Sequence, residues 1–530
     1  MVNSFSLGRL TLLAVGASLL LFTGGPAGAQ QPNLNTETLR IAWDRDEHGV
    51  VTSWAAALPE SSAGKGRWRS LVSTDEASER ISRHLAVSLP GVSDWQRVDS
   101  GVDGDGLAGE WLSADGEWRL ELTLAPSDQP WRLWLDVTLE SVNAASVEAL
   151  GLQLGPGIGE RPMEGLGIAR SLYSYTDAVA YRDGEVVRLD ADEDDRPAEL
   201  VPGEWLGLHS RYFALLAAPV EGPASIGIET GRAGDFESLP ADYLPWIRLR
   251  LPVGEQTAGK STHWRLALFS GPKTQAALAG GDESVDHSSL LFNSLWNWMR
   301  GLSLGLLWVL QAIHSMVPSW GLAICLLAVL VRLLLYPLGR WALSSQQRFS
   351  EVQAEIAPKV REIKENYRGG EQSERILQLY ETRGVSPMAG LKPLLIVLIQ
   401  IPVFVAMFHV LGQVFEFRDA SFLWIDSLAE PDRLFGFGID LPFFGAWFNL
   451  LPVLMVLTTL ASIRLSPAPA ASAAEKRRQN LFLWLMAAAF FLLFYPFPSG
   501  MVLYWIMANV LYVAQFQLTR QSSRNGAWKY

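Results

Sequence analysis

An apolar run at residues 320–337, WGLAICLLAVLVRLLLYP, contains a single charged residue, Arg332. A run of about 18 apolar residues is long enough to be a transmembrane helix. A charge at bilayer depth costs about 3 kcal/mol or more, so it is usually retained for a function and faces a polar cavity. The alternative is that Arg332 snorkels, because its long side chain can reach the interface near Tyr336. The run therefore predicts a membrane protein.

The chain of 530 residues divides into an acidic part and a more apolar, mildly basic part. The net charge is -12, and the acidic excess lies in residues 31–286, before most of the apolar runs. Cys325 is the single cysteine, which excludes an intrachain disulfide, and we interpret it as a small apolar residue. These patterns indicate a solvated acidic domain followed by a membrane domain.

Residues 1–29 have the layout of a secretory signal peptide, in which Arg9 precedes an apolar core and small residues precede Gln30. The core, residues 10–22, is short for a membrane span, which favours cleavage after Ala29. An uncleaved membrane anchor is the alternative. In both cases the domain that follows would lie outside the cytoplasm.

Residues 30–286 are expected to form an antiparallel β-sandwich. In residues 131–140 every second residue is apolar, which predicts a strand with one buried face, and residues 118–124 repeat the pattern. Two dipeptides are typical of hairpin turns: Asp115-Gly116 and Asp183-Gly184. Many short strands joined by such turns are typical of a sandwich.

No pattern in this acidic domain indicates catalysis. It has no spacing typical of metal ligands, no glycine-rich phosphate loop after a strand, and no convincing Ser-His-Asp order. The acidic run at 190–195, DADEDD, could hold a cation, but a solvated loop is the favoured interpretation.

Residues 287–319 are apolar enough to suggest a second span, but the basic residues of the segment that follows the first span argue against it. If this segment and residues 320–338 both crossed the membrane, the basic segment 340–390 would lie outside, whereas short basic loops stay in the cytoplasm. Several apolar residues of the first segment share one helical face: Leu302, Leu306, Val309, Leu310, Ile313 and Val317. We therefore predict an amphipathic interfacial helix on the outer leaflet.

The basic segment 340–390 is predicted to be a cytoplasmic helical hairpin. Apolar residues recur at helical spacing in residues 349–367, Gly369-Gly370 gives the turn, and residues 376–380 continue the pattern. A hairpin that packs only on itself is the alternative interpretation.

Four further apolar regions complete a predicted membrane core at 320–520. After the first span at about 320–338, the spans are expected at 391–413, 443–463, 481–498 and 499–518. The loop at 412–442 is acidic and would lie outside, while Arg464, residues 476–478 and the short tail at 521–530 are basic and would lie inside. The chain thus has five predicted spans, or six if the N-terminal segment is kept as an anchor.

Residues 289–520 resemble the YidC/Oxa/Alb family of membrane protein insertases. The stretches that carry the resemblance are IHSMVPSWGLAI at 313–324, VRLLLYPL at 331–338, IAPKVREIKENY at 356–367, LYETRGVSPMAGLKPLLIVLIQIPVF at 379–404 and FPSGMVLYWIMANVLYVAQFQL at 497–518. The Gram-negative branch has a large periplasmic β-sandwich, to which residues 203–219 and 269–273 are similar. The resemblance implies a multi-pass protein of the bacterial inner membrane with this domain in the periplasm.

The resemblance also implies a function. Members insert nascent membrane proteins into the phospholipid bilayer, alone or with the Sec translocon, without enzymatic catalysis and without a nucleotide, metal or other cofactor. It implies a hydrophilic groove in which Arg332 attracts substrate carboxylates, with four further residues nearby: Gln400, Tyr504, Trp505 and Asn509. The hairpin would receive substrates, with Arg348, Lys359, Arg361, Tyr380 and Glu381 as its candidate residues.

Three departures from the family pattern qualify these expectations. Trp505 replaces the tyrosine usual at its position, the N-terminus resembles a cleavable signal, and the short tail leaves the ribosome a doubtful partner. No specific nucleic acid partner is indicated. A solute transporter is one alternative, although internal repeats are not evident. An envelope protein that binds carbohydrate through the sandwich is another, but a fold alone does not establish a function.

Overall fold

The computed structural model describes most of the chain after the N-terminal segment. The described residues are 33–43, 51–57, 68–71, 84–103, 106–143, 145–158, 175–189, 198–222, 225–232, 245–280, 285–382, 392–441, 444–465 and 473–524. The predicted signal peptide at 1–29, the acidic run at 190–195 and the tail after 524 lie outside them.

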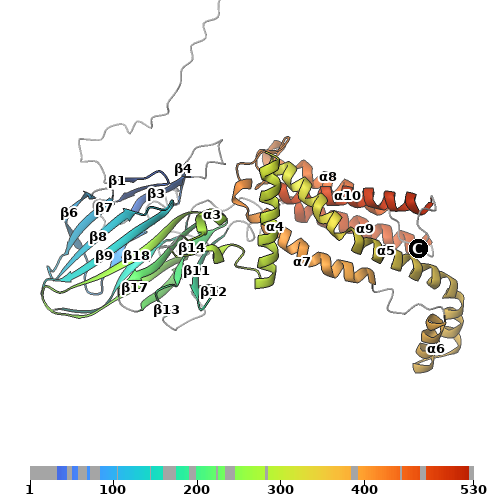
Figure 1. The fold of residues 1–530 in the computed structure, drawn as a ribbon, viewed down its shortest axis with the longest axis horizontal. Helices are drawn as coiled ribbons and strands as arrows, with labels where there is room; N and C mark the ends of the chain where they lie inside the picture. Colours follow the sequence, from blue (N-terminus) through green and yellow to red (C-terminus); the bar gives the residue numbers. More distant parts are fainter. Residues whose placement is uncertain are drawn as a thin grey trace, which may run out of the picture.

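A β-domain lies at one end of the molecule and a bundle of helices at the other (Figure 1). The largest sheet has nine antiparallel strands in the order β12-β11-β14-β15-β18-β9-β8-β7-β6. In chain order these strands are β6 (Trp95–Asp103), β7 (Gly106–Ser113), β8 (Trp118–Pro126), β9 (Arg132–Ser141), β11 (Thr176–Arg182), β12 (Glu185–Arg188), β14 (Trp205–Ser210), β15 (Phe213–Glu221) and β18 (Ser261–Pro272).

Two smaller sheets complete the β-domain. One has the order β13-β16-β17-β10-β5, with bounds β5 (Val87–Ser88), β10 (Ala145–Leu154), β13 (Ala198–Leu200), β16 (Ile226–Arg232) and β17 (Pro245–Gln256). The other consists of β1 (Asn33–Asn35), β2 (Leu39–Trp43), β3 (Val51–Ala57) and β4 (Trp68–Ser70). Because β17 packs against β11, β14 and β18, the five-stranded sheet covers the nine-stranded sheet, and the two form the predicted sandwich.

The alternating apolar residues form the core of this sandwich, as predicted. Their side chains are buried on β8 and β9: Trp118, Leu120, Leu122, Leu124, Leu133, Leu135, Val137 and Leu139. The two predicted turns also connect the expected strands, β7 to β8 and β11 to β12. Gly116 and Gly184 have φ angles of 73° and 86°, a conformation that glycine adopts without steric cost.

The second half of the chain is mainly helical. The helices are α3 (Gln275–Leu278), α4 (Asn297–Met316), α5 (Trp320–Asn366), α6 (Gly370–Glu381), α7 (Lys392–Gln413), α8 (Leu450–Leu465), α9 (Ala473–Phe494) and α10 (Ser499–Arg524), with 3-10 turns η3 (Ser288–Leu290) and η5 (Phe415–Phe417). Helix α10 packs against α5, α7 and α8, while α9 packs against α8. Among the described residues, the segment Trp320–Leu338 alone meets both the length and the hydropathy of a membrane span; the other apolar helical segments are shorter.

The predicted first span and the first helix of the predicted hairpin belong to one continuous helix. Helix α5 continues through Pro337 and Pro358 and ends only at Asn366. Each proline removes one backbone hydrogen bond, which a long helix can tolerate. The helical spacing of apolar residues ends before the pair Gly369-Gly370. Gly369 has a φ angle of 67° and α6 begins at Gly370, so the predicted turn is confirmed.

Three helices have bounds that differ from those of the predicted spans that they overlap. Helix α8 begins at Leu450 and not at 443, because the preceding residues pair as strands β19 (Phe435–Leu441) and β20 (Gly445–Phe448). Helix α9 covers Ala473–Phe494 and α10 continues to Arg524. Charged and polar residues are good helix formers, so these helices extend beyond their apolar parts, while α9 ends before Pro496.

Helix α4 is amphipathic, but its buried face differs in part from the predicted one. The buried residues are Met299, Ser303, Leu307, Leu310 and Ile313, whereas Leu302, Leu306 and Val309 are only half-buried. Apolar residues on two sides of this helix made the face ambiguous, since Trp296, Trp298 and Trp308 are all exposed. Figure 1 shows α4 lying across the ends of the other helices, between them and the β-domain.

Candidate functional site

The β-domain contacts the helices through the turn between β14 and β15. The Arg211 Nε atom donates a hydrogen bond to the Gly412 carbonyl oxygen at 2.7 Å. The rings of Tyr212 and Phe213 meet the Phe415 ring edge-on, with centroids 6.0 and 5.6 Å apart. The Arg418 guanidinium lies over both rings of the turn. This contact joins the sandwich to the end of α7.

Lys273 supports that turn from inside the sandwich. Its Nζ atom lies 3.0 Å from His209 Nδ1 and donates to the Ser210 carbonyl oxygen at 3.1 Å. Its backbone N–H donates to the Tyr212 carbonyl oxygen at 2.7 Å. Burial lowers the pKa of Lys273 to about 7, and burial together with the Lys273 charge holds the pKa of His209 well below its usual value. A buried polar network therefore shapes the surface that meets α7.

Arg332 lies inside the helical bundle, on the part of α5 that packs against α10. Its guanidinium carbon is 5.0 Å from the centre of the Tyr512 ring, and the Tyr504 hydroxyl lies within electrostatic reach of it. Its Nε atom is buried without a hydrogen-bond partner among the described residues. Within that part of the chain no carboxylate forms an ion pair with Arg332. The site thus holds a half-buried cation between α5 and α10.

Asn509 connects two helices through a side-chain hydrogen bond. Its Nδ2 atom donates to Thr459 Oγ1 on α8 at 2.7 Å, and that hydroxyl in turn donates to the Met455 carbonyl oxygen at 2.7 Å. The Ser462 hydroxyl donates to the Thr459 carbonyl oxygen at 2.7 Å. Such hydrogen bonds between helices are a common packing device in membranes. Asn509 therefore has a structural role in joining α10 to α8.

Trp505, one turn before Asn509 on α10, belongs to an aromatic cluster with rings of α7 and α9. Its ring lies 5.2 Å from Phe404 on α7 and 5.8 and 5.3 Å from Phe490 and Phe494 on α9. Gln400 is half-buried on α7, one turn before Phe404. The ring of Trp505 closes the contact between α7 and α10 near this glutamine.

Four of the five predicted groove residues thus lie on α5 or α10, but they face different neighbours. One residue of the site was missed as a candidate: Tyr512, whose ring lies beside the Arg332 guanidinium. Tyr512 follows Tyr504 by eight residues, and residues at that spacing lie on one stripe of a helix. That spacing is the signal that could have identified it.

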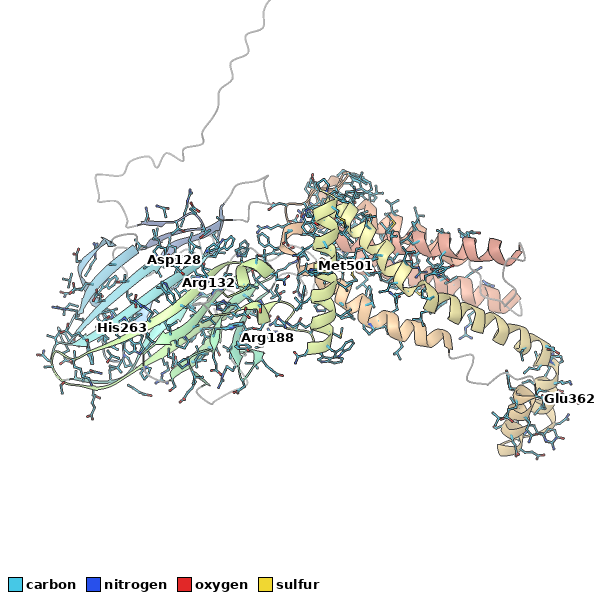
Figure 2. All side chains as sticks on the ribbon, viewed as in Figure 1. Asp128, Arg132, Arg188, His263, Glu362 and Met501 are labelled. Atoms are coloured by element: carbon cyan, nitrogen blue, oxygen red, sulfur yellow. The ribbon has the colours of Figure 1, made fainter. Side chains whose placement is uncertain are left out.

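The predicted hairpin residues lie at the far end of α5. Figure 2 shows Glu362 beside α6 and Met501 at the opposite end of the bundle, toward the β-domain. Lys359, Arg361 and Glu381 are exposed and Tyr380 is half-buried, while the side chain of Arg348 lies outside the described residues. Helix α6 is held to the end of α5 by Arg375, whose guanidinium lies 3.9 Å from the centre of the Tyr367 ring.

The family comparison covers the helical part of the chain. Residues 312–525 match the family described as 60Kd inner membrane protein. The membrane protein insertase YidC of Methylobacillus flagellatus is 30% identical over 333 residues, which cover 61% of this chain and 52% of the relative. That of Thioalkalivibrio sulfidiphilus is 31% identical over 366 residues, or 67% of this chain and 58% of the relative. The chain therefore spans little more than half the length of the curated relatives it matches.

Two solved structures are similar at low scores. A crystal structure of active YidC insertase with its first transmembrane domain resolved is 17% identical, covers 91% of this chain and 94% of that chain, and has a TM-score of 0.32. A putative aldose 1-epimerase from Escherichia coli K12 is 11% identical, covers 46% and 98%, and has a TM-score of 0.28.

Proposed function

The chain belongs to the YidC family of membrane protein insertases, and from this membership we propose that it inserts nascent membrane proteins into the bacterial inner membrane. The observation that carries the proposal is Arg332, a half-buried cation on an apolar helix with no carboxylate partner among the described residues. A charge in this position is costly, so a role in binding a transient anionic group accounts for it. The activity requires no bond to be made or broken in the substrate.

The proposed topology has five spans, formed by the first part of α5 and by α7, α8, α9 and α10. The β-domain would lie in the periplasm, α4 on the outer leaflet and the hairpin in the cytoplasm. This placement is supported by the arrangement in Figures 1 and 2, where the β-domain and the end of α5 near Glu362 lie at opposite ends of the bundle. It is also supported by the basic residues of the hairpin, since such segments remain in the cytoplasm.

The proposed mechanism lowers the cost of moving polar chain through lipid. The acidic tail of a substrate would enter a groove beside α5 and α10, where Arg332 attracts its carboxylates and the hydroxyls of Tyr504 and Tyr512 can bond its backbone. The apolar segment would then leave between α7 and α10, and its transfer into lipid drives release. The contact between Trp505 and Phe404 joins these two helices, so it would have to open during that step.

Several partners follow from this proposal. Nascent membrane proteins and phospholipids are its direct partners, and the Sec translocon would act with the chain on larger substrates. The ribosome is a further candidate at the cytoplasmic end. The transporter and carbohydrate-binding alternatives are not favoured by any specific contact among the described residues.

Photocrosslinking tests whether substrate passes the proposed groove. With a photoreactive amino acid at Gln400, we expect capture of a stalled nascent chain that carries an acidic N-terminal tail. This half-buried position on α7 lies one turn before Phe404, whose ring meets Trp505 of α10. The matched control is the same amino acid at Val187, which is 40% exposed on β12, an edge strand of the nine-stranded sheet. Equal capture at both positions, or none at Gln400 in a folded protein, would contradict the groove.

A further inference from the structure

The strands β19 and β20 form a small ribbon with an unusually apolar exterior. Leu434, Phe435, Ile439 and Trp447 are 41%, 51%, 63% and 46% exposed. The aromatic rings are gathered together, since Phe435 stacks on Phe448 with centroids 4.9 Å apart and lies 5.8 Å from Phe437. Such a concentration of exposed apolar side chains is uncommon on a surface that faces only water.

The ribbon is firmly attached to the helices at both ends. Before it, the buried Asp432 carboxylate accepts hydrogen bonds at one oxygen from the Trp424 indole at 3.1 Å and from the backbone N–H groups of Leu450 and Leu451 at 2.8 and 3.1 Å. After it, the Asn449 side chain accepts from the Arg433 N–H at 3.1 Å and donates to the Tyr495 carbonyl oxygen at 2.9 Å. These bonds fix the direction in which the ribbon presents its apolar side chains.

The apolar exterior of the ribbon continues onto helix α9. Phe444, between the two strands, packs against Phe491 and Tyr495 with ring centroids 6.1 and 4.9 Å apart, and the Tyr495 hydroxyl donates to the Trp447 carbonyl oxygen at 2.9 Å. The outer side of α9 is itself apolar and exposed, with Leu481, Phe482, Trp484, Leu485, Leu492 and Leu493 each at least 41% exposed. Ribbon and helix thus form one connected apolar surface.

We propose that strands β19 and β20 form a membrane-contacting ribbon that places Phe435, Ile439 and Trp447 in the outer leaflet, at the level of the headgroups and the first acyl carbons. The proposal rests on the membrane placement of α9 in the proposed function, because lipid that meets the face of α9 also reaches the ribbon. Tryptophan is favoured at this depth, where its apolar ring and its polar N–H are both accommodated, while Phe435 and Ile439 add apolar area. The ribbon would hold the end of α9 at a constant depth.

The test uses a fluorescent probe at single cysteines in the full-length protein. The background is Cys325→Ser, and an environment-sensitive probe is attached to Ile439→Cys after reconstitution into liposomes of phosphatidylethanolamine and phosphatidylglycerol. We expect a blue-shifted emission and quenching by a nitroxide on the lipid headgroup or acyl carbon 5 that is at least twofold stronger than quenching by a nitroxide on acyl carbon 12. Val187→Cys, an exposed position on β12, is the matched water-facing control.

The outcome that overturns the proposal is a probe at Ile439 that aqueous iodide quenches as strongly as the probe at Val187. Protection from iodide without quenching by any lipid nitroxide would also overturn it, because the occupant would then be protein. A third probe at Phe482→Cys, 64% exposed on α9, reports the membrane placement separately. If Phe482 meets lipid and Ile439 does not, only the ribbon proposal fails; if neither meets lipid, the proposed topology fails as well.

Discussion

Replacing Arg332 with alanine is expected to reduce insertion of a small single-span protein with an acidic tail by about tenfold or more, because the groove loses its attraction for carboxylates. Two opposite charges about 4 Å apart attract by about 4 kcal/mol at the effective dielectric constant of a protein surface, and about 1.4 kcal/mol corresponds to a factor of ten. Arg332→Lys is expected to retain more activity than Arg332→Ala. Lysine keeps the charge but loses the planar contact with the Tyr512 ring.

The assay for these variants is protease protection of the substrate in liposomes that contain the purified protein. Cys325→Ala is the matched control, because it lies on the same helix two turns earlier and removes no charge. A substrate whose tail acids are replaced by amides should depend much less on Arg332. If Arg332→Lys and Arg332→Ala lose activity equally, charge attraction is not the main role of this residue.

Acidification is expected to destabilise the β-domain, largely through buried histidines. His84 is fully buried, and its Nδ1 atom accepts a hydrogen bond from the Gly155 N–H at 3.0 Å, so the folded domain requires the neutral ring. Burial lowers the pKa of His84 from 6.5 to about 4, and burial with the nearby Arg132 charge lowers that of His287 to about 3. The unfolded chain takes up these protons at about pH 6.5.

The sign of the effect follows from this difference in proton binding. The contribution of these neutral histidines to the stability of the β-domain is fully present above pH 6.5 and is lost as the pH falls toward 4. In that pH range the histidines are protonated only in the unfolded chain. For His84 the gap between 6.5 and about 4 corresponds to a loss of about 3 kcal/mol. The measurement is amide hydrogen exchange of β10 in the full-length protein at pH 7.5 and at pH 4.5, corrected for the intrinsic exchange rates.

A pair of variants separates the contribution of His84 to the loss of stability at low pH from a general effect of acid on the β-domain. His84→Asn keeps a hydrogen-bond acceptor but cannot be protonated. The decrease in the free energy of opening between pH 7.5 and pH 4.5 should therefore be smaller in this variant than in the unmodified protein, by about 2 to 3 kcal/mol. Val187→Asn, at an exposed position on β12, changes no titratable group and should leave the pH dependence unchanged. An unchanged pH dependence in His84→Asn would contradict the assignment.

Local patterns in the sequence predicted the β-domain well, because alternation and turn chemistry act within a few residues. Leu120 and Leu135 are buried where the period of two predicts, and Gly184 occupies the turn that its dipeptide indicates. The contact between Arg211 and Gly412 was not predictable in this way. The two residues are 201 positions apart, and no local pattern encodes which surfaces of two domains meet.

The helical boundaries were less predictable for a different reason. Hydropathy marks where a helix is apolar and does not mark where it ends, so α5 continues well past its apolar part to Asn366. The apolar residues just before Leu450 suggested the start of a span, but Gly436, Gly438 and Gly445 permit the tight pairing of a ribbon. Arg332 was identified as a candidate because a charge stands out in an apolar run, whereas Tyr512 does not stand out in such a run.

The most direct test of the central claim is insertion by the purified chain alone. A small single-span protein with an acidic tail is synthesised in the presence of liposomes that contain this protein and no other, and insertion is scored by protease protection. We predict protection clearly above that in empty liposomes. Protection equal to that in empty liposomes, with the protein shown to be folded by the exchange protection of β10, would contradict an insertase that acts by itself.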